Sequence, residues 1–93
     1  MIVKTLYLEM YLPQSNSLKD KRRVVKSLTQ RLRQKFNVAV SEIEDSDDIR
    51  NTTIGIVTVT NYDAFADKIL DKCLNLIETE YDVDIINIER NRV

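Results

Sequence analysis

The sequence contains no histidine and no tryptophan, and only one cysteine, one proline and one glycine. Without histidine, a Ser-His-Asp triad, a histidine acid–base catalyst and a histidine-ligated metal are all excluded. The single cysteine, Cys73, excludes an internal disulfide and a zinc site built from cysteines. Its place in ILDKCLNLI has the spacing of a buried position on a helix. A P-loop and a GxGxxG motif are also absent, so we expect no cofactor.

Long apolar runs are absent as well. No stretch approaches the roughly 18 apolar residues that a membrane-spanning helix needs. The start of the chain, MIVKTLYLEMYLP, alternates in polarity and lacks the basic segment and cleavage site of a signal peptide, which indicates a strand. A length of 93 residues, with 43% apolar and 31% charged residues, is typical of one globular domain, residues 1–93. We therefore expect a cytoplasmic protein with no membrane partner.

The pattern of apolar residues predicts six elements of secondary structure. Strands are predicted at residues 2–12, from strict alternation, at 37–43, at 52–60, which is rich in β-branched residues and apolar on both faces, and at 82–89. Stripes with the helical period predict helices at 18–36 and 62–80. With right-handed crossovers, the order β-α-β-β-α-β predicts an α+β, ferredoxin-like sandwich. In this fold a four-stranded antiparallel sheet carries both helices on one face, with the first and third strands in the centre.

Some details within these elements are also predicted. Ser17 and Asn61 are expected to cap the two helices at their N-termini. Gly55, inside a strand, indicates a bulge or a close approach of another chain segment. In the last strand the apolar residues change parity between Ile85 and Ile86, which indicates a bulge or a second covered face.

Charge is distributed unevenly along the chain, although its net value is only −1. Residues 17–36 contain eight of the 14 Lys and Arg residues and one acid. Several of these cations stand in SLKDKRRVVKSL, at the helix start, where the helix dipole makes each one cost about 0.3–1 kcal/mol. The free N–H groups of a helix start and nearby cations together form an anion site, and an RNA backbone can use the whole helix length of roughly 25 Å. The candidate nucleic-acid-binding residues are Lys19, Lys21, Arg22, Arg23, Lys26 and Arg33.

Two other interpretations of the basic helix stay open. Its cations can form a solvated face, or they can pair with the acidic segment from Glu42 to Asp48. Lys21 differs from the other cations because its position on the helical wheel lies among apolar residues. A structural role, with the stem packed and the ammonium reaching solvent, is therefore favoured for it. In the acidic segment Asp45, Asp47 and Asp48 could bind Mg²⁺, but a solvated turn is the favoured interpretation.

The sheet face away from the helices is expected to carry Tyr7 and Tyr11. RNA recognition motifs stack bases on aromatic side chains of this face, but the strand at 52–60 has none. That strand is apolar on both faces, which favours a homodimer through the open face. A small-ligand sensor at the dimeric face is a weaker hypothesis. Acylphosphatases share this fold, but the segment PQSNS lacks the arginine of their phosphate loop, and we expect no enzyme.

Three segments of the sequence resemble the YlxP family of small bacterial proteins, a domain of unknown function. They are SLKDKRRVVKSL with the following RLRQKFNVAVSE, TIGIVTVTN, and the ending DVDIINIE, and the resemblance extends over essentially the whole chain. It implies a ferredoxin-like fold. Genes of the family often lie beside those for initiation factor two and ribosome-binding factor A, which implies a role near translation or ribosome maturation. No catalytic residue is carried over; the matching motif is Ser17, Leu18, Lys19, Asp20, Lys21 and Arg22.

The leading hypothesis is a non-enzymatic, RNA-binding or ribosome-associated protein that uses the outer face of the basic helix. The alternative is a dimeric interaction module that docks an acidic protein partner on the same helix. The isoelectric point near 5.4 favours the alternative, because it is unusual for an RNA-binding protein.

Overall fold

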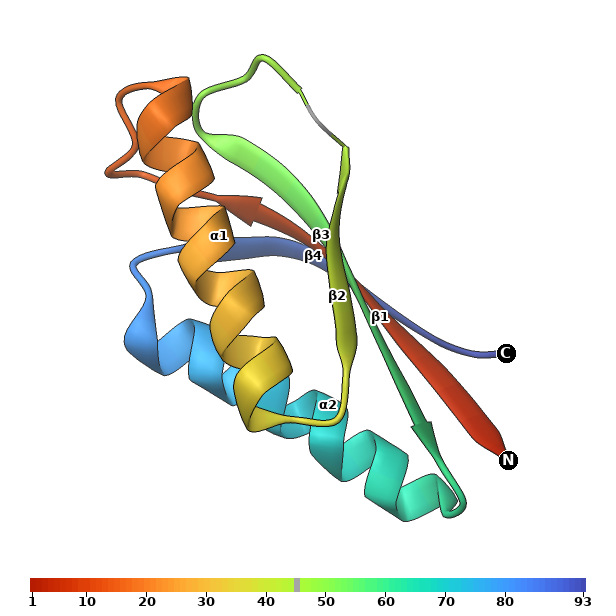
Figure 1. The fold of residues 1–93 in the computed structure, drawn as a ribbon. Helices are drawn as coiled ribbons and strands as arrows, with labels where there is room; N and C mark the ends of the chain where they lie inside the picture. The colour runs from red at the N-terminus through yellow and green to blue at the C-terminus, as the bar shows by residue number, and fades with distance from the viewer. Residues whose placement is uncertain (45) are drawn as a thin grey trace.

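The sheet has the strand order β2-β3-β1-β4, with antiparallel pairing between all neighbours, and both helices lie on one of its faces (Figure 1). A computed structural model describes residues 1–44 and 46–93. The elements are β1 (Ile2–Tyr11), α1 (Leu18–Lys35), β2 (Ala39–Glu44), β3 (Asn51–Thr60), α2 (Asp63–Glu80) and β4 (Asp84–Arg92). The predicted α+β, ferredoxin-like arrangement is confirmed, with β1 and β3 in the centre.

The hydrophobic core lies between the two helices and the sheet. Alternation along β1 directs Leu6 and Leu8 into the core, and Tyr7 between them faces the other side of the sheet. The apolar side chains that are at most 1% exposed come from β1, α1, β3 and α2: Leu6, Leu8, Met10, Leu28, Leu32, Ile54, Ile56, Ala66, Leu70, Cys73 and Ile77. Each large aliphatic side chain that is buried in this way contributes about 1.5–3 kcal/mol. The predicted burial of Cys73 is confirmed.

The two helices begin differently. At α1 the Ser17 hydroxyl accepts a hydrogen bond from the backbone N–H of Asp20 at 3.0 Å, so the predicted N-cap is confirmed. The cap predicted for α2 is wrong by one position, because the N-cap is Tyr62 and it makes no side-chain cap bond. The hydroxyl of Thr60 closes this turn instead, since it bonds both the backbone N–H and the carbonyl of Tyr62. Asn61 therefore lies one residue before the N-cap and does not cap the helix.

A β-bulge explains the change of parity in β4. Ile88 lies opposite Leu8 and Ile85 lies opposite Met10, and the register shifts between these two pairs. Because three steps on β4 match two steps on β1, both isoleucines belong to the helix-covered side of the sheet. The bulge is one of the two explanations predicted from the sequence. The strand itself begins at Asp84 and ends at Arg92, so it starts two residues and ends three residues later than predicted.

Gly55 allows another side chain to approach the sheet closely. It lies in β3 between Tyr7 of β1 and Ser41 of β2. The register of β2 shifts between Glu42 and Glu44, and the intervening Ile43 covers the glycine. A Cβ atom on Gly55 would lie 2.8 Å from Cδ1 of Ile43, so a larger residue would force the isoleucine to move. The predicted close approach at this glycine is confirmed.

Candidate nucleic-acid interface

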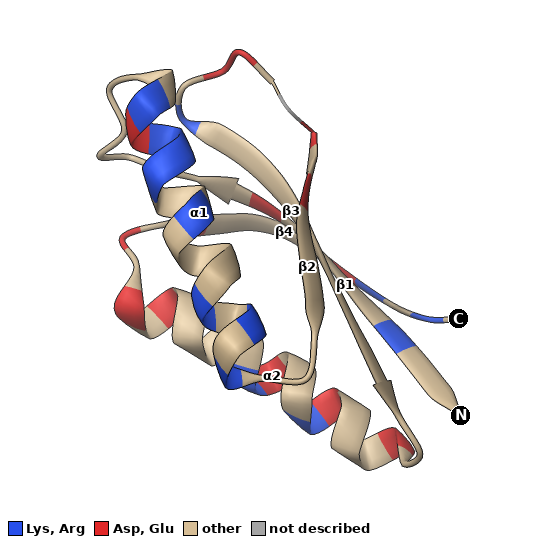
Figure 2. Ribbon diagram, viewed as in Figure 1, with Lys and Arg blue, Asp and Glu red and all other residues tan. Residues whose placement is uncertain are grey.

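Five of the seven exposed cations of α1 lie along one side of the helix (Figure 2). The apolar residues Val25, Leu28 and Leu32 recur at helical spacing and are buried against the sheet. Packing of these residues turns the opposite side of the helix toward solvent. The basic face of α1 consists of five exposed residues: Lys19, Arg22, Arg23, Lys26 and Arg33.

Few carboxylates neutralise this basic face. Arg23 lies 3.9 Å from Asp20 on the same helix, and Arg33 donates a hydrogen bond to the carbonyl of Val40 at 2.9 Å. Among residues 1–44 and 46–93, no carboxylate lies within 4.0 Å of the other three cations, Lys19, Arg22 and Lys26. These three side chains are exposed to solvent and can bind an anionic partner without breaking an ion pair in that part of the chain.

Two carboxylates of the acidic segment Glu42–Asp48 accept hydrogen bonds from residues outside the basic helix. Oδ1 of Asp48 accepts the backbone N–H of Arg50 at 2.9 Å, and the side-chain amide of Asn51 donates to Oδ2 at 2.8 Å. These bonds, the first above all, hold the pKa of Asp48 below its ordinary value. Glu42 accepts a hydrogen bond from the hydroxyl of Thr52 at 2.6 Å. Within the described part of this segment, the predicted pairing with the basic helix is therefore not observed.

A metal site at this turn has no support from the described residues. Asp45, one of the three aspartates considered for Mg²⁺, lies outside them. In the rest of the chain, no group of three carboxylate or thiol side chains is arranged to hold a metal ion. The carboxylate of Asp48 is engaged with the backbone N–H groups of the turn.

Lys21 is separated from the basic face by its burial. Its side chain is 2% exposed, although it belongs to the first turns of the same helix. The ammonium donates three hydrogen bonds, to the carbonyl oxygens of Ser46 at 2.8 Å, Asp48 at 2.6 Å and Asn51 at 3.2 Å. All three N–H donors of the ammonium are therefore used within the protein. The predicted structural role of Lys21 agrees with its burial. The ammonium, which was expected to reach solvent, instead bonds three backbone carbonyl oxygens. Lys21 is therefore not part of the exposed surface.

The loop between β1 and α1 is bonded to the loop before β3, a contact that the sequence did not predict. Ser15, 3% exposed, donates its hydroxyl to the carbonyl of Ile49 at 2.5 Å. The backbone N–H of Leu12 donates to the carbonyl of Arg50 at 2.7 Å. The loop before α1 and the loop before β3 are thus bonded to each other, and Lys21 joins the helix to the second of them. A serine in a turn-rich segment carries no sequence signal for such a contact.

A groove runs between α1 and β2 beside the basic face. Its volume is about 460 Å³, and Arg22, Lys26 and Arg33 line its helical side. Ser41 and Glu42 of β2 line the other side. Because β2 is an edge strand, the groove follows a free edge of the sheet. Cations of α1 therefore stand next to this edge, where Arg33 already bonds the carbonyl of Val40.

Tyr7 and Tyr11 lie on the sheet face that the helices leave open, as their position in β1 predicted. Both side chains are partly buried, and the Tyr7 hydroxyl donates to the carboxylate of Glu9 at 3.3 Å. Burial, followed by the charge of Glu9, raises the pKa of Tyr7. Val59, 48% exposed, and Ile43, 54% exposed, add apolar surface from β3 and β2. A homodimer through this open face stays a prediction.

Cys73 does not have the properties of a catalytic nucleophile. The thiol is buried in the core, and burial raises its pKa to about 11. At neutral pH the side chain is therefore a protonated thiol, whereas nucleophilic cysteines react as thiolates.

The chain is thus an α+β, ferredoxin-like domain whose first helix presents an exposed basic face. Over residues 3–90 it matches a family described as a protein of unknown function (DUF503). It is also 37% identical over 65 residues to the uncharacterized protein YlxP of Bacillus subtilis (strain 168), an alignment that covers 70% of this chain and 71% of the relative. The chain belongs to the DUF503 family, and the resemblance to the YlxP family is confirmed. Neither description names an activity or a ligand.

In the described ranges on either side of residue 45, neither helix has the length and apolar character needed to cross a membrane.

Proposed function

We propose that the protein binds RNA without catalysing a reaction, and that the basic face of α1 contacts the RNA phosphates. The observation that carries this proposal is the exposure of Lys19, Arg22 and Lys26 with no carboxylate within 4.0 Å among the residues described. The helix dipole disfavours a cation at the position of Lys19, in the first turn, and no described acid offsets any of the three charges, so an anionic partner explains them best. Ribosomal RNA is the partner that we expect, because the family resemblance implies a role near translation.

The length of the basic face favours a polymer over a single small anion. From Lys19 to Arg33 the helix axis advances about 21 Å, at 1.5 Å per residue. One phosphate group occupies a small part of that length, whereas an RNA backbone presents phosphates all along it. Contacts of this kind position a nucleic acid and do not read its bases, so low sequence selectivity is expected.

Binding to a labelled single-stranded RNA of about 20 nucleotides, followed by fluorescence anisotropy, tests the proposal. With about four phosphates neutralised, the logarithm of the association constant falls with the logarithm of salt concentration at a slope of roughly −3. Arg22→Glu reverses one charge of the basic face and is expected to weaken binding roughly tenfold. Lys68→Glu, on α2, makes the same change of net charge at an exposed site away from this face, and is the matched control.

Two results would contradict the proposal: binding that does not depend on salt, and unchanged binding when Arg22→Glu is combined with Lys26→Glu. Co-sedimentation with ribosomal subunits at several salt concentrations then tests the narrower expectation. Loss of co-sedimentation in the double variant, but not in Lys68→Glu, would connect the ribosome to the basic face.

A second candidate function is the docking of an acidic protein segment on the same side of α1. The groove between α1 and β2 favours it, because an extended segment placed along the free edge of β2 would bring acidic side chains to Arg22, Lys26 and Arg33. Pull-down experiments with and without nuclease separate the two candidates. Partners that remain after nuclease treatment support the protein-docking function, and partners that disappear support RNA binding.

A further inference from the structure

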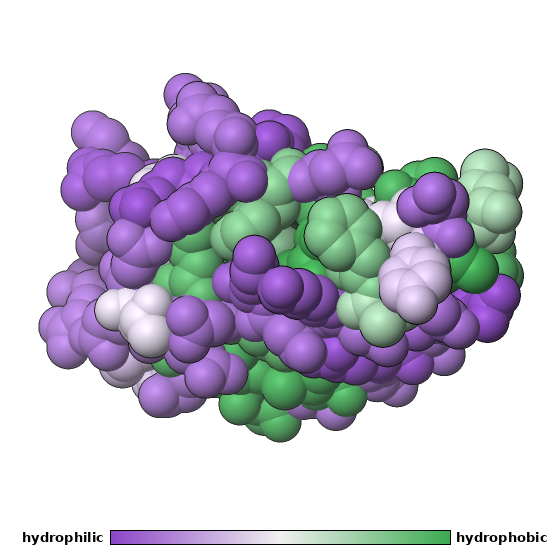
Figure 3. All heavy atoms as spheres, turned by 90° about the horizontal axis from the view of Figure 1, so that it is seen from below, coloured by the Kyte–Doolittle hydropathy of each residue, from purple (hydrophilic) through white to green (hydrophobic). Residues whose placement is uncertain are grey.

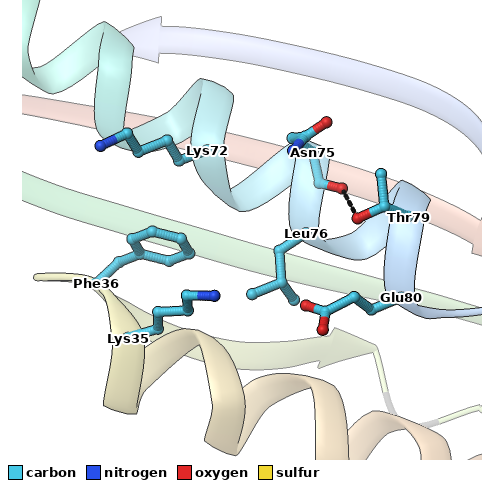
Figure 4. Close-up of a pocket in the computed structure, with 7 residues that line it drawn as sticks. All are labelled: Lys35, Phe36, Lys72, Asn75, Leu76, Thr79 and Glu80. Atoms are coloured by element: carbon cyan, nitrogen blue, oxygen red, sulfur yellow. Dashed lines mark hydrogen bonds between the residues drawn. The ribbon is translucent and has the colours of Figure 1, made fainter.

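A second groove, separate from the one beside β2, lies between the C-terminal end of α1 and α2 (Figure 4). Its volume of about 550 Å³ falls in the range of small-molecule sites. The apolar part of its wall is formed by Phe36, which follows α1 and is partly exposed, and by Leu76 of α2, which is 4% exposed. The lining residues are Lys35, Phe36, Lys72, Asn75, Leu76, Thr79 and Glu80.

The charges around this groove favour an anion. Lys35 of α1 and Lys72 of α2 are both exposed, and the part of the chain with described coordinates places no carboxylate within 4.0 Å of either ammonium. The one acid that lines the groove, Glu80, is held by Arg31 at 2.6 Å. In the view of Figure 4 the ring of Phe36 lies between the side chains of the two lysines. An aromatic ring is thus combined with a cation from each helix.

The surroundings limit how a ligand can approach. In the view of Figure 3, apolar surface runs as a band through the middle of the face, and hydrophilic side chains border it. A wholly apolar ligand would leave the ammonium groups of Lys35 and Lys72 without a partner. A small planar group with negative charge at its edge matches the groove better, because it can stack on the Phe36 ring while Lys35 and Lys72 pair with its charge.

We propose that this groove holds one unpaired nucleotide of the bound RNA, with its base against Phe36 and its phosphates beside Lys35 and Lys72. This inference rests on the proposed RNA-binding function and specifies the class of RNA. A base can reach the ring only if it is not paired and stacked within a duplex. The groove therefore makes the protein a single-strand binder, because base stacking on aromatic side chains is how sequence-tolerant single-strand sites gain affinity.

The basic face leads to the groove around the last turn of α1. Arg33 and Lys35 are about 200° apart on the helical wheel, so they lie on opposite sides of that turn. The exposed Gln34 lies between them on the outer side. An RNA strand that follows the basic face therefore crosses the helix at Gln34 and enters the groove from its open side. From Lys26 to Phe36 the helix axis advances roughly 15 Å, a distance that several nucleotides can cover.

The experiment compares one labelled RNA sequence as a single strand and as a duplex. We expect the wild-type protein to bind the single strand at least about tenfold more tightly. Phe36→Leu keeps an apolar side chain but removes the ring, and is expected to weaken single-strand binding roughly tenfold while leaving duplex binding unchanged. Lys72→Gln should act in the same direction by a smaller factor. Lys68→Gln, one turn earlier on α2 and outside the groove, is the matched control and should have no effect.

A second readout keeps the test independent of the stability of Phe36→Leu. A 2-aminopurine placed in the single strand reports stacking through quenching of its fluorescence, and this quenching should fall in Lys72→Gln but not in Lys68→Gln. Equal affinity for single strand and duplex, or equal loss of both in Phe36→Leu, would overturn the nucleotide groove and leave the basic face as an RNA site. Absence of binding to either RNA would overturn both proposals.

Discussion

The helices α1 and α2 are both 18 residues long and lie on the same face of the sheet, yet their charged residues meet different partners. Among the described residues, four of the five acids of α2, all but Glu78, are paired with cations from other elements. Lys4 of β1 lies 2.8 Å from both Asp63 and Asp67. On β4, Arg90 pairs with Asp71 and Arg92 with Asp63.

The cations of α1 have no comparable set of acids. Arg31 pairs with Glu80 of α2, but it lies outside the basic face. Within that face the one ion pair in the described chain is Arg23 with Asp20, at 3.9 Å on an exposed surface, where such pairs are worth little. The comparison explains how a chain with net charge −1 can present a strongly basic surface. Among the described residues, the ion-paired cations of the sheet, Lys4, Arg90 and Arg92, all meet acids of α2, whereas Lys19, Arg22 and Lys26 of α1 meet none.

The largest expected effect is on stability, and it distinguishes Lys21, the buried cation of α1, from its exposed neighbour Lys19. Lys21→Met is expected to lower the free energy of unfolding by about 2–3 kcal/mol, because three carbonyl oxygens lose a charged donor. Lys19→Met, two residues earlier and exposed, should stay within about 0.5 kcal/mol of wild type. Urea denaturation measures both values.

Hydrogen exchange adds a local check on the same pair of variants. The loop around Ser46–Asn51 should lose protection in Lys21→Met and keep it in Lys19→Met, because Lys21 bonds this loop directly. If the two variants unfold at the same urea concentration, the three hydrogen bonds of Lys21 contribute nothing to stability and the contrast between inner and outer cations fails.

A smaller effect is expected from the ion pairs around α2. The side-chain hydrogen bond to Asp63, and then that to Asp67, raises the pKa of Lys4, and the bond from Lys4 lowers the pKa of Asp63. A lowered carboxyl pKa adds stability above the ordinary pKa of aspartate, and this stability is lost as the pH falls through the folded value. Lys4→Met should therefore lower the urea midpoint at neutral pH, and the difference from wild type should narrow near pH 3, about where aspartates protonate.

Lys68→Met is the control for this variant, because Lys68 is an exposed lysine of α2 with no carboxylate within 4.0 Å among the described residues. Its midpoint should match wild type at both pH values. A difference for Lys4→Met that is the same at neutral and acid pH would mean that lost packing, and not the ion pairs, is responsible.

The smallest effect is expected in the turn before β3, which both Lys21 and Asp48 stabilise. The pKa of Asp48 is lowered first by the N–H of Arg50 and next by the side-chain amide of Asn51. Because the folded protein lowers this pKa, the ionised Asp48 adds stability above the ordinary pKa of aspartate, and that stability disappears as the pH falls through the folded value. Asp48→Asn should lower the thermal midpoint slightly at neutral pH and not at all in acid. Asp47→Asn, exposed and without a hydrogen bond in the described chain, should change neither value.

Sequence reasoning was strongest where the signal is local. The Ser17 cap, the apolar stripe of α1 and the alternation of β1 all depend on neighbours within a few positions, and the structure agrees with each. The N-cap of α2 was misplaced because the side chain of Thr60 closes that turn, and propensity alone does not reveal which nearby residue will do so. The role of Lys21 was half predicted: its wheel position indicated burial, but the carbonyls that it bonds lie 25 to 30 residues further along the chain.

By itself, the sequence determined the order of the six elements and the concentration of cations on one helix, because periodicity and charge runs are properties of short segments. Only the tertiary structure decided which charges are satisfied. Ion pairs join residues that folding brings together, such as Lys4 and Asp67, which are 63 positions apart. The second groove likewise exists only because the end of α1 packs beside α2. This packing brings Phe36 and Lys72, which are far apart in the sequence, to the lining of one groove.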